Sequence, residues 1–83
     1  MLLAEGRYPD ALAAFERVLR AAPDYAAAHN GAGAALASLG AIDAALPRFE
    51  EALRLRPDLP GVRENVEQAR RLLAARSSGE SPR

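Results

Sequence analysis

The sequence contains no cysteine, only one histidine and no long apolar run. Without cysteine the chain has no disulfide and no thiolate site, so cysteine usage does not indicate whether the protein works in an oxidising or a reducing compartment. No apolar segment approaches the roughly 20 residues that a helix needs to cross a bilayer. The first ten residues, MLLAEGRYPD, are too short and become charged too early for a signal peptide. We therefore expect a cytoplasmic location by default.

An excess of either charge is also missing. Eleven arginines stand against eleven acidic residues, and the formal net charge is zero. No electrostatic field steers such a chain toward nucleic acid or an anionic membrane, so we expect neither as a partner. The 83 residues make one small domain. Its free energy of unfolding should be about 4–12 kcal/mol, by the usual stability per residue.

Groups for catalysis or metal binding are scarce as well. No histidine, cysteine or carboxylate lies one helical turn from His29, which favours a packing or surface role over a metal site. Ser38 has only apolar residues at that spacing and lacks an activating base. No residue pair supports acid–base catalysis. The sequence predicts a protein that is not an enzyme, with no catalytic residue, no metal and no cofactor.

The segment Gly31-Ala32-Gly33 has some likeness to a glycine-rich phosphate loop. It lacks the third glycine and the lysine of such loops, and it lies inside a helical pattern rather than between a strand and a helix. Small residues within a helix let a neighbouring backbone approach closely. We therefore interpret this segment as a site of close helix packing.

What the sequence does contain is an internal repeat. Residues 6–24, GRYPDALAAFERVLRAAPD, and residues 40–58, GAIDAALPRFEEALRLRPD, are offset by 34 positions and agree at nine of them. The matching pairs are Gly6/Gly40, Ala11/Ala45, Leu12/Leu46, Phe15/Phe49, Glu16/Glu50, Leu19/Leu53, Arg20/Arg54, Pro23/Pro57 and Asp24/Asp58. A fixed period of about 20–50 residues indicates stacked supersecondary units.

The second copy resembles the tetratricopeptide repeat family. That family has a period of about 34 residues, a helix–turn–helix unit and an A-x3-F…P signature in its second helix. The residues that carry the resemblance are Gly33, Gly40, Ala45, Phe49, Ala52 and Pro57, with Gly6, Ala11, Phe15, Val18 and Pro23 in the first copy. It covers about residues 1–75. Two positions depart from the pattern, because His29 replaces a frequent large aromatic and Val18 replaces the usual alanine.

Apolar periodicity and helix-breaking residues predict the elements. We expect residues 1–5 to form the final turn of a helix, and helices over residues 9–22, 26–39, 42–55 and 60–76. The polar segment 77–83 should be disordered. The predicted fold is all-α, a TPR-like helical repeat in a domain of residues 1–76. It has about one and a half helix–turn–helix units, at residues 1–25 and 26–59, and a C-terminal capping helix at 60–76.

Three kinds of local feature are expected in these helices. Asp24 and Asp58 should cap the helices that follow them. Pro47 should lie in or near the first turn of its helix, where at most one backbone hydrogen bond is lost. Ion pairs four residues apart should form within helices. These pairs are Glu16–Arg20, Glu50–Arg54 and Glu67–Arg71.

The resemblance also implies a binding surface. In this family the first helix of each unit lines a concave groove that holds partner peptides or helices, which makes an adaptor or scaffold the expected role. The matching positions here are Ala27, Asn30, Ala34, Ala37, Ser38, Glu64, Gln68 and Arg71. The family's basic carboxylate clamp is absent. We therefore expect a protein or peptide partner, presented as a helix or an extended apolar segment.

A second surface follows from the incomplete first unit, because most of its first helix is missing from the sequence. If four apolar side chains of helix 9–22 lose half of their cover, the loss is roughly 3–6 kcal/mol. Residues on this face are Leu2, Leu3, Leu12, Phe15 and Leu19. The alternatives are a homo-oligomer that covers the face, a C-terminal end of a longer repeat array with no ligand of its own, or another protein that supplies the layer.

Overall fold

The computed structural model describes residues 7–77, and this part of the chain contains four helices and no strand. They are α1 (Tyr8–Ala21), α2 (Ala26–Ser38), α3 (Ile42–Leu55) and α4 (Val62–Ser77). The all-α helical repeat is thereby confirmed. The predicted helical turn at 1–5 and residues 78–83 of the predicted tail lie outside the described residues. Ser77, which we expected to begin that tail, is instead the last residue of α4.

The helix ends follow from local chemistry. Pro9 lies in the first turn of α1, where its missing N–H removes no intrahelical bond, and Asp10 complements the dipole there. Gly40 follows α2 with a φ of +88°, a left-handed conformation that a side chain disfavours. Gly61, at φ +82°, immediately precedes α4.

The predicted caps are wrong. Tyr25 occupies the N-cap of α2 and makes no side-chain capping bond, so Asp24 does not cap this helix. Asp58 lies four residues before the start of α4, and its Oδ1 accepts a hydrogen bond from Nε of Arg56 at 3.0 Å. That bond holds the pKa of Asp58 below its ordinary value.

Pro47 lies inside α3, beyond its first turn and on an exposed position, where one backbone hydrogen bond is lost.

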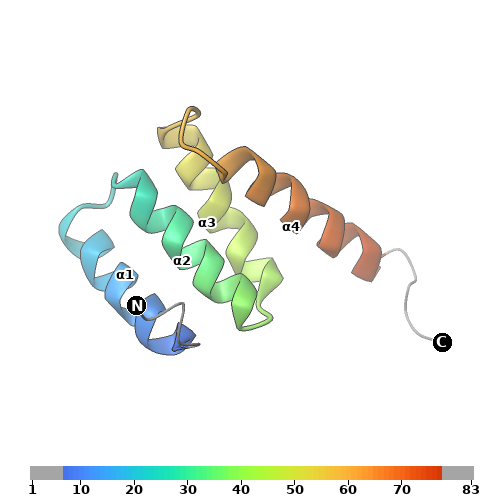
Figure 1. Cartoon of the computed structure of the whole chain (residues 1–83), viewed down its shortest axis with the longest axis horizontal. Coiled ribbons are helices and arrows are strands. Elements are labelled where there is room, and N and C mark those ends of the chain that lie inside the picture. Colours follow the sequence, from blue (N-terminus) through green and yellow to red (C-terminus); the bar gives the residue numbers. More distant parts are fainter. Residues whose placement is uncertain (1–6, 78–83) are drawn as a thin grey trace.

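Each helix packs against its neighbours in the chain. The principal contacts join α1 to α2, α2 to α3 and α3 to α4, and Figure 1 shows the four helices side by side in this order. The interior is built mainly from alanine: Ala32, Ala35, Ala45 and Ala52 are fully buried. Small side chains bring the helix axes close together, so the main-chain surfaces contribute much of the packing.

Two phenylalanine rings pack on the two glycines of α2. A Cβ atom at Gly33 would lie 2.6 Å from Cε1 of Phe49 in α3, and one at Gly31 would overlap the ring of Phe15 in α1. No real Cβ contact is that short, so both positions exclude a larger residue while the rings stay in place. The predicted role of this segment in close helix packing is confirmed.

The carboxylates pair differently from the prediction. Nη2 of Arg48 donates hydrogen bonds to both carboxylate oxygens of Glu16, at 2.7 and 2.6 Å, and so links α3 to α1. Nη2 of Arg70 in α4 donates to Glu50 at 3.1 Å. Arg54 donates to Glu51, and this hydrogen bond lowers the pKa of Glu51. The predicted pairs four residues apart are therefore wrong for Glu16 and Glu50, and within residues 7–77 no ion pair joins Glu67 to Arg71. Stacking brings arginines of other helices within reach, and these replace the partner on the same helix.

Candidate functional site

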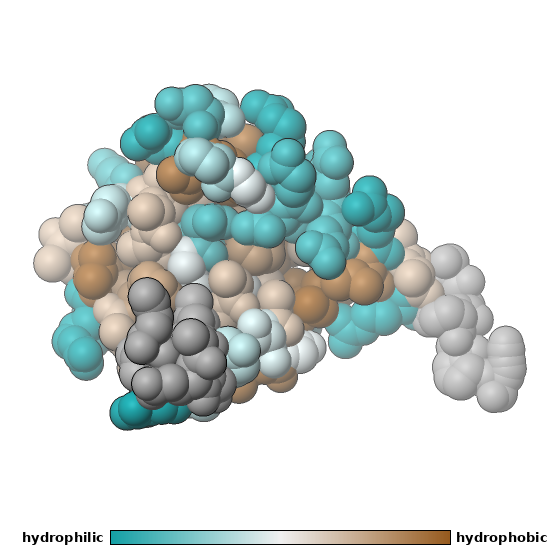
Figure 2. Space-filling model, in the orientation of Figure 1, coloured by the Kyte–Doolittle hydropathy of each residue, from teal (hydrophilic) through white to brown (hydrophobic). Residues whose placement is uncertain are grey.

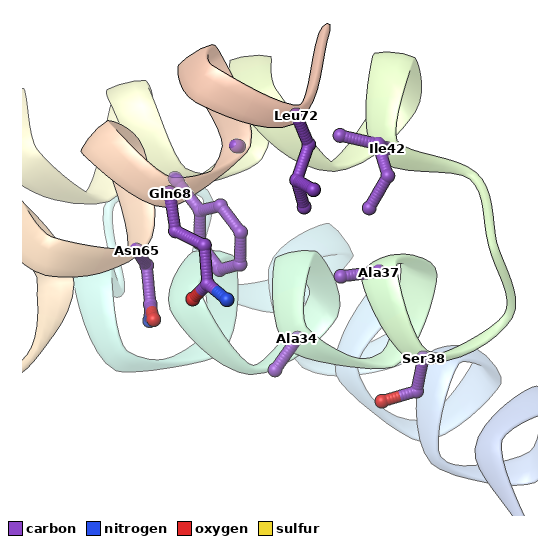
Figure 3. Close-up of a pocket in the computed structure, with 9 residues that line it drawn as sticks. Ala34, Ala37, Ser38, Ile42, Asn65, Gln68 and Leu72 are labelled. Carbon is purple, nitrogen blue, oxygen red and sulfur yellow. The ribbon is translucent and has the colours of Figure 1, made fainter. Parts of the chain in front are cut away.

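A cavity of about 300 Å³ lies between α2 and α4, over α3 (Figure 3). Its walls come from α2 and α4, while α3 supplies the floor and one end. The lining residues are Ala34, Ala37, Ser38, Ile42, Phe49, Asn65, Gln68, Ala69 and Leu72. None of these side chains is charged, so the cavity suits an apolar group rather than an ion.

The α2 wall is shallow because its side chains are small. Ala34, Ala37 and Ser38 lie along the same side of the helix, and they leave space between α2 and α4 that larger residues would fill (Figure 3). The whole of α2, AAAHNGAGAALAS, carries no charged residue. A partner backbone is therefore able to come close to this wall without displacing a hydrated charge.

The floor and one end of the cavity are strongly apolar. Phe49 is 4% exposed and belongs to the core cluster with Ala45, Val66 and Ala69. Leu72 of α4 and Ile42 of α3 lie across from each other at this end (Figure 3). Leu72 is 44% exposed, which is high for a large apolar side chain. Figure 2 shows an apolar patch beside the C-terminal half of α4, bordered by hydrophilic residues.

The other end of the cavity is closed by two amides. Nδ2 of Asn65 in α4 donates a hydrogen bond to Oδ1 of Asn30 in α2, at 3.0 Å and partly buried. The bond uses one donor of Asn65 and the acceptor of Asn30, and it ties the two walls together. Ser38 and Gln68, both exposed, are the remaining polar side chains along the lining.

The structure brings together part of the predicted groove. Ala34, Ala37, Ser38 and Gln68 line the cavity, and Asn30 joins it through its bond to Asn65. The other three predicted residues are exposed and stand outside the lining; they are Ala27, Glu64 and Arg71.

Sequence reasoning missed five lining residues, namely Ile42, Phe49, Asn65, Ala69 and Leu72. Three of them lie one or a few positions from Gln68 on α4. Extending the predicted α4 face from Gln68 by one neighbour at helical spacing would have found Asn65 and Leu72, but not Ala69, which directly follows Gln68. Ile42 and Phe49 belong to α3, which the prediction left out of the groove. The repeat pattern gave no signal that the second helix of a unit forms the floor.

The face predicted for self-association is only partly open. Leu2 and Leu3 lie outside the described residues. Leu12 and Phe15 are half-buried, whereas Leu19 is 8% exposed and already covered within the chain.

The equivalent positions on α3 show what α1 lacks. Phe49 is 4% exposed and Ala52 is fully buried, because α3 packs between α2 and α4. Their counterparts on α1 are the half-buried Phe15 and Val18, which is 39% exposed. Within the described residues α1 packs chiefly against α2. Its other side is therefore a second candidate surface.

The single histidine, His29, makes a contact within the fold. Nε2 of His29 donates a hydrogen bond to the carbonyl oxygen of Pro23 at 2.8 Å, and its Nδ1 is buried without a hydrogen-bond partner. Across residues 7–77, no three acidic, histidine or cysteine side chains gather in a way that would hold a metal ion. None of the four described helices is both long enough and apolar enough to span a membrane.

A comparison with protein families gives one match. A family model described as tetratricopeptide repeat matches residues 2–60, well over half of the chain. Neither the curated proteins nor the solved structures gave a significant match.

Proposed function

The chain belongs to the tetratricopeptide repeat family, and from this premise we propose that it binds a segment of a partner protein in the groove between α2 and α4. Repeats of this family generally mediate protein–protein interaction, and the family is typically a non-enzymatic interaction module. The proposal goes further, because it assigns the binding to one surface of this chain. Its expected role is that of an adaptor or scaffold.

The observation that carries the proposal is the apolar cavity. The cavity has a volume of about 300 Å³, with an aromatic floor, a wall of alanines and the exposed side chain of Leu72. Close packing of the three helices would have filled this space. Pockets that bind ligands are largely apolar, with a few polar groups that fix orientation, as Ser38 and Gln68 do here.

Blocking the groove should weaken peptide binding. The peptides are first selected from a random library on the wild-type chain. They should bind the Ala34→Arg variant at least tenfold more weakly, because the new side chain enters the cavity and central interface positions typically carry about 1–2 kcal/mol or more of binding energy. Isothermal titration calorimetry measures the affinities. The matched control is Ala27→Arg, on an exposed position of the same helix outside the lining, which should bind as wild type does. Equal binding to all three proteins would place the peptides elsewhere on the chain.

A second candidate function is self-association through α1. The observation in its favour is the contrast between Val18 and the equivalent Ala52, 39% against 0% exposed. A second copy of the chain that packs on this side of α1 would bury Val18 and the open part of Phe15. The module would then be structural and need no separate ligand.

Solution mass separates the two candidates. The self-association proposal predicts that sedimentation equilibrium gives a mass rising toward twice 8.8 kDa with concentration. Val18→Glu should return the chain to a monomer, since a charge in an apolar interface is costly. Leu39→Glu, at a large apolar residue 46% exposed on the α2–α3 connection, is the matched control and should leave the dimer intact. A monomer at every concentration would exclude this function and leave the groove.

A further inference from the structure

We infer that the occupant of the groove is an amphipathic helix that lies antiparallel to α4. It places one large apolar side chain in the cavity, an acidic residue from its first turn beside Arg71 and a basic residue from its last turn beside Glu64. The inference rests on the proposed function, since it names the kind of partner that the same groove accepts.

The hydrogen-bonding groups of the groove favour a helix over an extended peptide. An extended segment leaves its backbone N–H and C=O groups to be satisfied by the protein that binds it. In this groove one hydrogen bond already joins Asn65 to Asn30, and the groups left for a backbone are few: the other half of each of these two amides, Ser38 and Gln68. A helix satisfies its backbone internally and needs few such groups. The alanines of α2 let it approach closely.

The cavity sets the anchor of that helix. At about 300 Å³ it lies at the small end of ligand pockets, so it accepts one or two side chains and not the whole face of a helix. Its floor includes the ring of Phe49, which packs with Val66 and Ala69 between Glu64 and Arg71 on α4. Ile42 and Leu72 lie at one end (Figure 3). An aromatic or long aliphatic side chain matches this lining, and a charged one would be buried without a partner.

On the two walls of the groove the charges come from α4, because α2 has none. Glu64 and Arg71 are exposed and stand on either side of Gln68, seven residues apart, or roughly 10 Å along the helix. Within residues 7–77 neither makes an ion pair, whereas the neighbouring Arg63 and Arg70 are turned to Pro57 and Glu50. The groove is therefore negative near the start of α4 and positive toward its end.

This polarity fixes the direction of the partner. Helices are stabilised by acidic residues in the first turn and basic residues in the last, so the acidic end that pairs with Arg71 is an N-terminus. Figure 1 shows that α2 and α4 run the same way, and Figure 3 places Leu72 and Ser38, the last residue of α2, toward the same end of the cavity. The partner's N-terminal dipole then meets two C-terminal dipoles, which also favours the antiparallel arrangement.

The test is a selection from a displayed library of 14-residue alanine-based helices, randomised in the first turn, the last turn and the centre of one face, so that positions 4 and 11 have the spacing of Glu64 and Arg71. The wild-type chain is the target, and binders to Ala34→Arg are subtracted. The second target is the double variant Glu64→Arg, Arg71→Glu, which keeps both the composition and the net charge unchanged. Both altered positions are exposed, and thermal melts followed by circular dichroism check that its fold is retained.

Peptides enriched on the wild-type chain should carry an acidic first turn, a large apolar residue at the centre and a basic last turn. Peptides enriched on the double variant should carry the same charge order but bind in the reverse direction, because their acidic first turn then pairs with the arginine introduced at position 64. A nitroxide spin label at the peptide N-terminus should therefore broaden the amide signals around Arg71 on the wild-type chain and those around position 64 on the double variant. Wild-type binders should bind the single variant Arg71→Glu several-fold more weakly, because in either direction one attractive pair becomes repulsive.

The outcomes separate this inference from the proposal beneath it. If peptides enrich without a charge order, or if the spin label broadens the signals around Glu64 on the wild-type chain, the antiparallel helix is wrong while groove binding stands. If no peptide enriches on the wild-type chain over Ala34→Arg, groove binding itself is wrong and the inference falls with it.

Discussion

Replacing Phe49 by alanine should lower the free energy of unfolding by about 3–5 kcal/mol, the usual cost of removing a buried aromatic ring. The ring is 4% exposed, packs on Gly33 and belongs to the cluster that joins α3 to α4. A chain of this size has only about 4–12 kcal/mol of stability in total, so the variant should lose at least about a quarter of it. Urea denaturation followed by circular dichroism measures the change.

The matched variant is Phe15→Ala. Phe15 is the same residue at the equivalent repeat position, but it is half-buried, and its ring packs on Gly31. We expect about half the loss, near 2 kcal/mol. Equal losses at the two positions would show that Phe15 is as fully covered in solution as Phe49. That result would favour a partner or a second copy on α1.

Enlarging Ala32 to leucine should be the second large effect, with a loss of about 1–3 kcal/mol. Ala32 is fully buried in α2, the helix that packs against both α1 and α3, so the added carbon atoms have no space on either side. Leucine is a good helix former and a more apolar residue, and both properties would predict a gain in stability if packing did not matter. The sign of the change therefore tests how closely the alanine interior is packed. Thermal and urea denaturation give the value.

Ala27→Leu is the control on the same helix. It makes the same chemical change on an exposed position, where substitutions usually change stability by less than about 0.5 kcal/mol. A loss at Ala32 that does not exceed the loss at Ala27 would mean that the helices separate easily. The model of an interior held by small residues would then be wrong.

The helices and their repeat were predictable from the sequence because each depends on residues close together in the chain. Gly40 and the apolar spacing in Ile42–Leu55 are local signals, and the 34-residue offset displays them twice. The glycines of α2 were also interpretable, since a small residue inside a helix predicts close packing whatever the neighbour is. The neighbour itself, Phe15 on one glycine and Phe49 on the other, needed the structure.

The features that the sequence did not predict depend on distances between helices. Arg48 is 32 residues from Glu16, and nothing local distinguishes it from Arg20 as a partner. Asn65 was not predicted because its role arises from its position opposite Asn30. The cavity likewise exists because three helices meet around small residues, and no single helix carries its pattern.

The serial arrangement of the helices also bears on how the chain folds. Its principal interfaces each join two helices that are consecutive in the sequence, so few distant segments must find each other before structure forms. Folding rates rise as contacts become more local, and helical proteins of this kind reach the native state in microseconds to milliseconds. Helices α2 and α3, each held on two sides, should exchange their amide hydrogens most slowly, while α1 and α4 open first. The groove has one wall on α4, so its shape would then be lost and regained more often than the rest of the molecule.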